Sequence, residues 1–153
     1  MAGSSTARPT FRYDLADPRA YVEAERLRVE DPSIEWVPVL APPAYHCAAE
    51  IDTVKEDVER EAAKLGLQPV RWPDPFPFDS ERVMLAATYA KQIGRAVAFS
   101  LAAFRQAYAA GRPLDDDDNI LIAAAACEMH PRAVLKALET RGVRDALTEA
   151  TGR

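Results

Sequence analysis

The chain has 153 residues, 48% of them hydrophobic and 28% charged, which is enough to bury the core of one soluble domain and excludes a disordered chain. Its net charge of −5 lacks the excess of Lys and Arg that binding to nucleic acid or to an anionic membrane surface requires. No apolar run approaches membrane-spanning length, so we expect no partner of either class.

The N-terminal segment, residues 1–9, is small and polar and contains a proline. It lacks the apolar stretch of about 7–15 residues that a signal peptide requires. We therefore expect a disordered N-terminus, a single domain over residues 10–153, and a protein that stays in the cytoplasm.

Two segments have the pattern of strands, with a helix between them. Residues 10–15 alternate apolar and polar side chains, and residues 34–40 are rich in β-branched and aromatic side chains. Pro38 places the second strand at a sheet edge or close to its own end. Residues 20–30 carry apolar side chains at helical spacing. Together the three segments predict a strand–helix–strand unit with parallel strands.

A charged helix follows over residues 48–65, and Gly66 is expected to end it in a left-handed conformation. Prolines and aromatic residues then alternate over residues 72–78, which excludes a helix or a central strand. We expect this stretch to form a rigid, extended strap. Asp79 or Ser80 then caps the next helix.

The rest of the chain is helical in pattern. Apolar stripes on both sides of Gly94 predict a helical hairpin or a kinked pair of helices. Acidic residues 115–118 begin another helix, Pro131 begins the next, and the apolar spacing from Val143 onward predicts a last one. The expected fold is therefore α/β and helix-dominated, with a helical subdomain over residues 79–151.

Motifs of a known family follow one another in order along this chain. They are an Asp-x-x-x-Pro segment after the first strand, a Trp-x-Pro strand, a Trp-Pro-x-Pro-Phe-Pro strap and several helical segments, at residues 14–18, 36–38, 72–77, 83–87, 94–108 and 111–116. In these motifs the chain resembles the DsbA-like thioredoxin family, specifically its 2-hydroxychromene-2-carboxylate isomerase and kappa-class glutathione transferase branch. The resemblance covers residues 10–151 and implies a thioredoxin-like fold with an inserted helical domain.

The resemblance places Asp17 at the reactive position of the family, before Pro18 at the start of the first helix. The isomerase and transferase branch has a serine there that favours the thiolate of glutathione, and the redox branch has the first cysteine of Cys-x-x-Cys. Here the two positions are Asp17 and Ala20, and a carboxylate cannot exchange disulfides. Asp17 is either a general base toward a thiol or hydroxyl, or only the N-cap of the helix.

The resemblance also implies that the chain binds glutathione and a small aromatic substrate. The expected glutathione contacts are Pro18, Asp79 and Ser80. The expected substrate contacts are Tyr45, His46, Trp72 and Phe76. The two strap aromatics are alternatively core residues, because large aromatic side chains account for much of the buried area in proteins.

No metal is expected. Cys47 and Cys127 lie far apart, and in a reducing compartment we expect both as thiols in buried apolar positions. Cys127 and His130, three residues apart, are a potential chelating pair, and His46 and Cys47 would add two more zinc ligands. His46 and Cys47 are adjacent in sequence, however, which is a poor spacing for a zinc site. The acidic run 115–118 lacks the glycine and glutamate of a calcium loop, so a helix start explains it better.

In the family, the helical domain leads into a strand with a cis Val-Pro bond, a further antiparallel strand and a closing helix. This chain ends at Arg153, about where that return begins. Two strands alone are marginally stable in water. Either a partner supplies the remaining strands, foremost a second copy pairing at the sheet edge, or the chain is an incomplete or degenerate member.

Three functions remain open. The first is a glutathione-dependent isomerase or transferase acting on a small aromatic compound, in which the thiol of glutathione adds reversibly to the substrate. The second is a catalytically silent binding or assembly module that keeps the fold. The third, a thiol-disulfide oxidoreductase, requires cysteines that positions 17 and 20 do not have.

Overall fold

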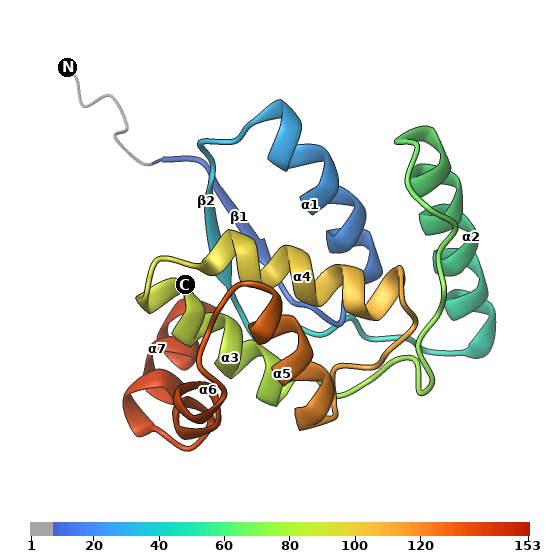
Figure 1. Cartoon of the computed structure of the whole chain (residues 1–153). Helices are drawn as coiled ribbons and strands as arrows, with labels where there is room; N and C mark the ends of the chain where they lie inside the picture. Colours follow the sequence, from blue (N-terminus) through green and yellow to red (C-terminus); the bar gives the residue numbers. More distant parts are fainter. Residues whose placement is uncertain (1–7) are drawn as a thin grey trace.

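The computed structural model describes residues 8–153, so the N-terminus expected to be disordered, residues 1–9, lies almost entirely outside the described residues. Helices make up most of the described chain, and two short strands form one parallel sheet. Figure 1 shows α4 (Ala96–Tyr108) crossing the middle of the molecule. In this view α1 (Pro18–Glu30) lies above α4, and α2 (Ala48–Lys64) lies at the right-hand side. The helix-dominated α/β fold predicted from the sequence is confirmed.

The sheet and its connecting helix have the predicted arrangement. β1 (Thr10–Tyr13) and β2 (Glu35–Pro38) pair in parallel, and α1 connects them. β1 is shorter than the alternating pattern indicated, because the chain turns at its end. The N–H of Asp17 donates to the carbonyl of Asp14 at 3.0 Å in that turn. This turn delivers the chain directly into α1.

One face of the sheet is packed with aromatic rings. Phe11 lies opposite Trp36 in the ladder, and the ring of Tyr13 contacts both, with centroids 5.0 to 5.5 Å apart. The Tyr13 hydroxyl shares a hydrogen bond of 2.5 Å with Ser100 of α4, and its ring lies 5.9 Å from that of Phe104. Helix α4 therefore covers this face.

The other face is covered from the C-terminal part of the chain. α3 (Glu81–Gln92) and α7 (Arg141–Gly152) both contact β2. Side chains alternate along a strand, so Arg12 of β1 points away from the aromatic face. Its Nη2 donates to the carbonyl of Ala150 in α7 at 2.8 Å. The sheet thus lies between two layers of helices.

The remaining helices join these layers. α5 (Asp117–Ala126) packs on α4, and α6 (Pro131–Leu138) packs on α3. Gly94, with a φ of 76°, separates α3 from α4, so the predicted pair of helices is present. None of the helices within residues 8–153 is long and apolar enough to cross a membrane.

Helix α2 lies at the side of the molecule, and its only buried residues are Val58 and Ala62. Gly66 follows its end with a φ of 72°, as the sequence predicted. Beyond Gly66 the chain turns back and runs alongside α2 before it reaches α3 (Figure 1). This returning segment includes the strap, residues 72–78, which has no regular secondary structure. The absence of helix and strand is as predicted, but the strap is not extended throughout, because the chain bends over residues 74–77, where the Asp74–Pro75 and Phe76–Pro77 bonds are cis.

Candidate functional site

Asp17 lies immediately before α1, at the position where the sequence resemblance places the reactive residue. Its backbone is extended, its Oδ1 accepts a hydrogen bond of 2.9 Å from the N–H of Arg19, and Pro18 occupies the first turn. The structure therefore makes Asp17 the N-cap of α1. The capping bond uses Oδ1, and the structure gives no hydrogen bond to Oδ2 within the described residues, so the same carboxylate retains an oxygen for a ligand.

The electrostatic environment of Asp17 favours uptake of a proton. Burial raises the pKa of its carboxyl above the usual range, although the N–H groups of Arg19 and Ala20 and the Arg19 charge act in the opposite direction. A carboxylate with a raised pKa is a better general base than an ordinary aspartate. Asp17 is also only partly buried, so a ligand can approach it.

Asp17 lines a groove of about 440 Å³ between α1, α2 and β1. Charged side chains line part of the groove, with basic groups from α1 and β1 and acidic groups from α1 and α2. Across it, the Arg19 Nη2 lies 3.2 Å from the Asp57 Oδ2 in an exposed ion pair. Its apolar lining comes from residues such as Val22 and Val58. A groove lined by both charged and apolar side chains suits a ligand that carries charged groups.

A second groove, of about 500 Å³, lies on the other side of Arg19. Tyr45 and Cys47 line it, together with residues of the first turns of α2. The hydroxyl of Tyr45 is buried and has no hydrogen-bond partner within residues 8–153. Burial raises the pKa of Tyr45 to about 12, and the negative charge of Asp17 adds to the effect. Arg19 therefore separates two grooves that both reach the start of α1.

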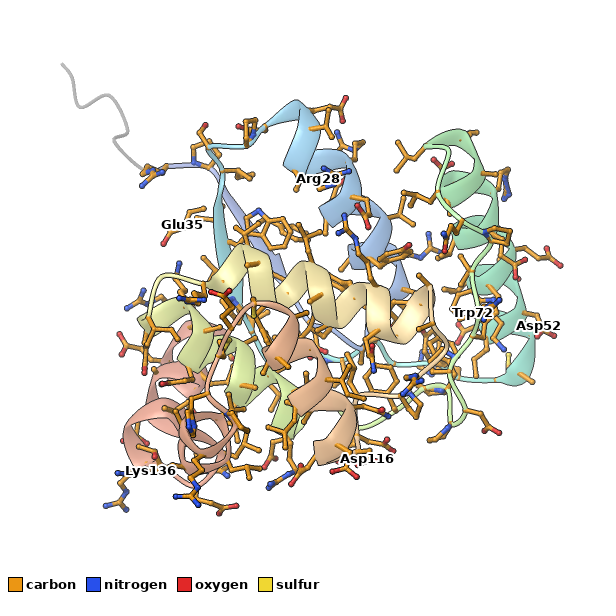
Figure 2. The ribbon with its side chains drawn as sticks, viewed as in Figure 1. Arg28, Glu35, Asp52, Trp72, Asp116 and Lys136 are labelled. Carbon is orange, nitrogen blue, oxygen red and sulfur yellow. The ribbon has the colours of Figure 1, made fainter. Side chains whose placement is uncertain are left out.

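Three of the predicted substrate contacts come together in space. The ring of Phe76 lies 6.1 Å from that of Tyr45 and 5.0 Å from that of Trp72. The ammonium of Lys55, on α2, lies 5.4 Å from the centroids of both strap rings. Trp72 Nε1 also donates to Glu59 at 2.8 Å, and Figure 2 shows Trp72 lying against α2. The strap aromatics thus pack between α2 and the core.

The other predicted contacts are not part of this cluster. His46 is exposed, and its N–H donates to the carboxylate of Glu50. Asp79 is exposed and its Oδ1 accepts from the N–H of Glu81 at 2.9 Å, in the role of a cap at the start of α3. Pro18 and Ser80 are buried, so neither presents its side chain to a bulky ligand in this structure.

Sequence reasoning assigned no role to Asp14, although this residue begins the Asp-x-x-x-Pro motif. Its side chain is buried beneath the site, where it accepts hydrogen bonds from three segments. The signal that could have found it is an acidic residue at the carboxyl end of a strand, immediately before a candidate site. Arg19 was missed as well, although a cation in the first turn of a helix is opposed by the helix dipole and therefore calls for an explanation.

The two cysteines are free thiols, as expected, but one environment was predicted wrongly. Cys47 is exposed, because as the N-cap residue of α2 it projects into the second groove instead of a core. Cys127 is partly buried, and its Sγ donates to the carbonyl of Ala124 at 3.4 Å. Within residues 8–153, no group of three or more His, Cys, Asp or Glu side chains is arranged to hold a metal ion.

Comparison with solved structures identifies the fold. A 2-hydroxychromene-2-carboxylate isomerase superposes with a TM-score of 0.80 at 18% identity, covering 94% of this chain and 76% of that one. A protein assigned as a protein disulfide isomerase, from Nitrosomonas europaea, gives 0.73 at 14% identity, over 96% of this chain and 78% of that one. A protein assigned as a DsbA oxidoreductase, from Streptomyces coelicolor, gives 0.65 at 19%, over 91% and 70%. The shared feature at these identities is the fold.

No curated protein matches the sequence. The family model of the DSBA-like thioredoxin domain matches residues 25–153, which is most of the chain. The match begins within α1, after Asp17, so the altered reactive position lies outside it. Family and fold agree with the resemblance in the sequence motifs. The chain therefore belongs to the DsbA-like thioredoxin domain family.

Proposed function

We propose that this domain binds a small thiol of the glutathione type at the start of α1. The domain uses this thiol either to isomerise a small aromatic compound or to form a thiol adduct with it. The observation that carries the proposal is the carboxylate of Asp17. It stands at the reactive position of the family, its pKa is raised by burial, and it lines a groove that a ligand can enter. Asp17 replaces the serine of the isomerase branch with a general base.

In the proposed reaction, Asp17 accepts the proton of the thiol while the sulfur attacks an electrophilic carbon of a conjugated double bond. The S–C bond forms, the former double bond rotates as a single bond, and the sulfur then leaves and recovers the proton from Asp17. As the S–C bond forms, the electron pair of the double bond moves onto the conjugated group of the substrate, and it returns when the sulfur leaves. Because Asp17 is neutral after accepting the proton, it does not repel this developing charge. The amino end of α1 stabilises that charge.

The energetics of this step favour proton transfer concerted with S–C bond formation over prior formation of a free thiolate. An ordinary carboxyl and an ordinary thiol differ by about 4.5 pKa units, which corresponds to roughly 6 kcal/mol against complete transfer. Burial of Asp17 narrows that gap by raising the pKa of the acceptor. The proton is therefore transferred as the S–C bond forms, which is general-base catalysis.

Disulfide exchange is not part of the proposal. It requires a sulfur nucleophile at the start of α1, and residues 17 and 20 are aspartate and alanine. The two cysteines are at positions 47 and 127 and are free thiols. The chemistry proposed here uses only the thiol of the bound ligand.

A second candidate is a binding or assembly module without catalysis. It is favoured because the candidate site residues already make contacts within the protein. Asp17 accepts the capping bond from Arg19, Ser80 donates to Asp14, and the strap aromatics Trp72 and Phe76 pack against each other. In this version the partner is a second copy of the chain, paired at the edge of β1 that faces away from β2. A two-stranded sheet has such an edge, and a further strand would stabilise it.

Calorimetric titration of the protein with glutathione, with light scattering on the same sample, tests the two candidates. Saturable binding at millimolar glutathione, abolished when S-methylglutathione replaces the thiol, supports the thiol-dependent function. Absence of binding by a folded protein whose mass is that of a dimer supports the assembly module. Absence of binding by a folded monomer contradicts both candidates.

A further inference from the structure

The carboxylate of Asp14 is the most connected buried polar group near the site. The residue is 3% exposed. Its Oδ1 accepts from the N–H of Ala16 at 2.8 Å, and its Oδ2 accepts from the N–H of Ala41 at 2.9 Å and from the Oγ of Ser80 at 3.1 Å. Its own carbonyl accepts from the N–H of Asp17 at 3.0 Å. One residue therefore joins three segments that are distant in sequence.

Each of these segments carries a residue of the candidate site. The turn held by Ala16 presents Asp17 at the start of α1. The loop held by Ala41 leads from β2 to Tyr45. Ser80 holds the segment that joins the end of the strap to α3, and the strap carries Phe76. Loss of the Asp14 carboxylate would release all three segments at once.

We propose that Asp14 is the positioning residue of the site, whose single carboxylate fixes the start of α1, the loop after β2 and the end of the strap relative to one another. The identity of the ligand in this inference rests on the proposed function. The positioning itself does not. Asp14 acts through Asp17, Tyr45 and Phe76 and is not expected to touch the substrate.

The chemistry of the group explains why this position is acidic. Three donors converge on the side chain, and an ionised carboxylate is a pure acceptor that can satisfy all three. Asparagine has one acceptor oxygen, and its amide would place an N–H group against a donor. Burial raises the pKa of Asp14, and its three hydrogen bonds oppose that effect. A group retained only for packing would be apolar, because a buried charge is costly unless it is hydrogen-bonded.

The test compares Asp14→Asn with Asp116→Asn by amide hydrogen exchange and glutathione titration. Asp116 is a matched control, since it is also an aspartate that accepts from a backbone N–H, at the start of α5 and away from α1 and α2 (Figure 2). We expect exchange at Ala16 or at Ala41 to become about tenfold faster in Asp14→Asn, because the asparagine amide has one acceptor oxygen and leaves one of these two N–H groups without a partner. Amides within α5 should keep their protection, and Asp116→Asn should leave Ala16 and Ala41 unchanged.

Ser80→Ala keeps the inference testable if Asp14→Asn does not fold, because it removes only one of the three bonds. It should change the fluorescence of Trp72 in the strap and weaken glutathione binding, with Ala16 still protected. A fall in thermal stability with no change in the exchange of Ala16 and Ala41, in Trp72 fluorescence or in ligand affinity would overturn the positioning role. If wild-type protein binds no glutathione, the proposed function fails, while exchange at Ala16 and Ala41 still decides the role of Asp14.

Discussion

Arg105 of α4 holds Glu25 of α1 with two parallel hydrogen bonds of 2.7 and 2.9 Å, although the Glu25 residue is only 5% exposed. Arg28 adds a third bond of 3.0 Å from within α1. Burial opposes ionisation of Glu25, but these bonds outweigh it and hold its pKa below the usual value. This pair fixes α1, and therefore the candidate site at its start, against the helical layer.

Replacing Arg105 with methionine should destabilise the protein by about 2 kcal/mol, less than the cost of breaking a fully buried pair, because Arg28 remains and Arg105 is half exposed. Urea denaturation measures this change. The loss should be largest above pH 4.5, the ordinary pKa of Glu25, because a lowered folded pKa contributes stability that disappears as pH falls through it. An equal loss at pH 7 and pH 3 would contradict the ion-pair explanation.

Asp17→Asn should separate stability from activity. Asparagine caps a helix as well as aspartate does, so α1 should keep its start. Because burial raises the pKa of Asp17, ionising it in the folded state costs stability at neutral pH, and the variant should melt at a higher temperature than wild type at pH 7. The difference should vanish below pH 3.8, the ordinary pKa of the group.

Isomerase or transferase turnover should be lost in the same variant while glutathione still binds, since an amide cannot accept the thiol proton. Steady-state kinetics with a panel of conjugated aromatic acids measures this loss. Wild-type turnover in Asp17→Asn would show that the carboxylate is only a cap.

Arg19→Ala should weaken glutathione binding about tenfold, because the guanidinium is the cation shared by both grooves and can exchange its exposed ion pair with Asp57 for a ligand carboxylate. Its exposed bond to Asp57 contributes little, so the free energy of unfolding should change by less than about 1 kcal/mol. Asp57→Asn releases Arg19 and should strengthen binding. The reverse order of affinities would exclude Arg19 as a ligand contact.

Trp72→Phe keeps an aromatic ring near Phe76 and removes the Nε1–H that donates to Glu59. We expect a loss of about 1 kcal/mol in the free energy of unfolding. Affinity for an aromatic ligand should stay within twofold if Trp72 only packs, since the ligand then makes no contact with the indole. Glu59→Gln, which keeps an acceptor, is the control for the hydrogen bond. A fall in ligand affinity without a fall in stability would identify Trp72 as a substrate contact.

Local patterns were sufficient to predict the secondary structure. Helical periodicity located the helices from α2 to α7. Glycine tolerates a positive φ, and both Gly66 and Gly94 adopt one where a helix ends. The end of β1 was placed too late, because alternation continues to Leu15 while the hydrogen bonds of Asp14 already turn the chain. Competition between a side chain and the strand ladder is not visible in hydrophobic alternation.

The site was harder to predict, because its contacts join segments far apart in sequence. Ser80 was expected to contact glutathione, yet its hydroxyl donates to Asp14, which lies 66 positions earlier. Cys47 was expected to be buried on composition alone, and its position as the N-cap residue of α2 exposes it. The meeting of Tyr45 with the strap aromatics followed from the family resemblance, since spacing alone gives no reason for it.

The most direct measurement is a ¹⁵N–¹H correlation titration of the wild-type protein with glutathione. If the thiol binds at the start of α1, the amides of Arg19 and Ala20 should shift saturably, and the Asp17 carboxyl should titrate at a different pH in the complex. Amides of α5 should not move. Shifts confined to other parts of the protein, or none at millimolar glutathione, would contradict a thiol site at Asp17.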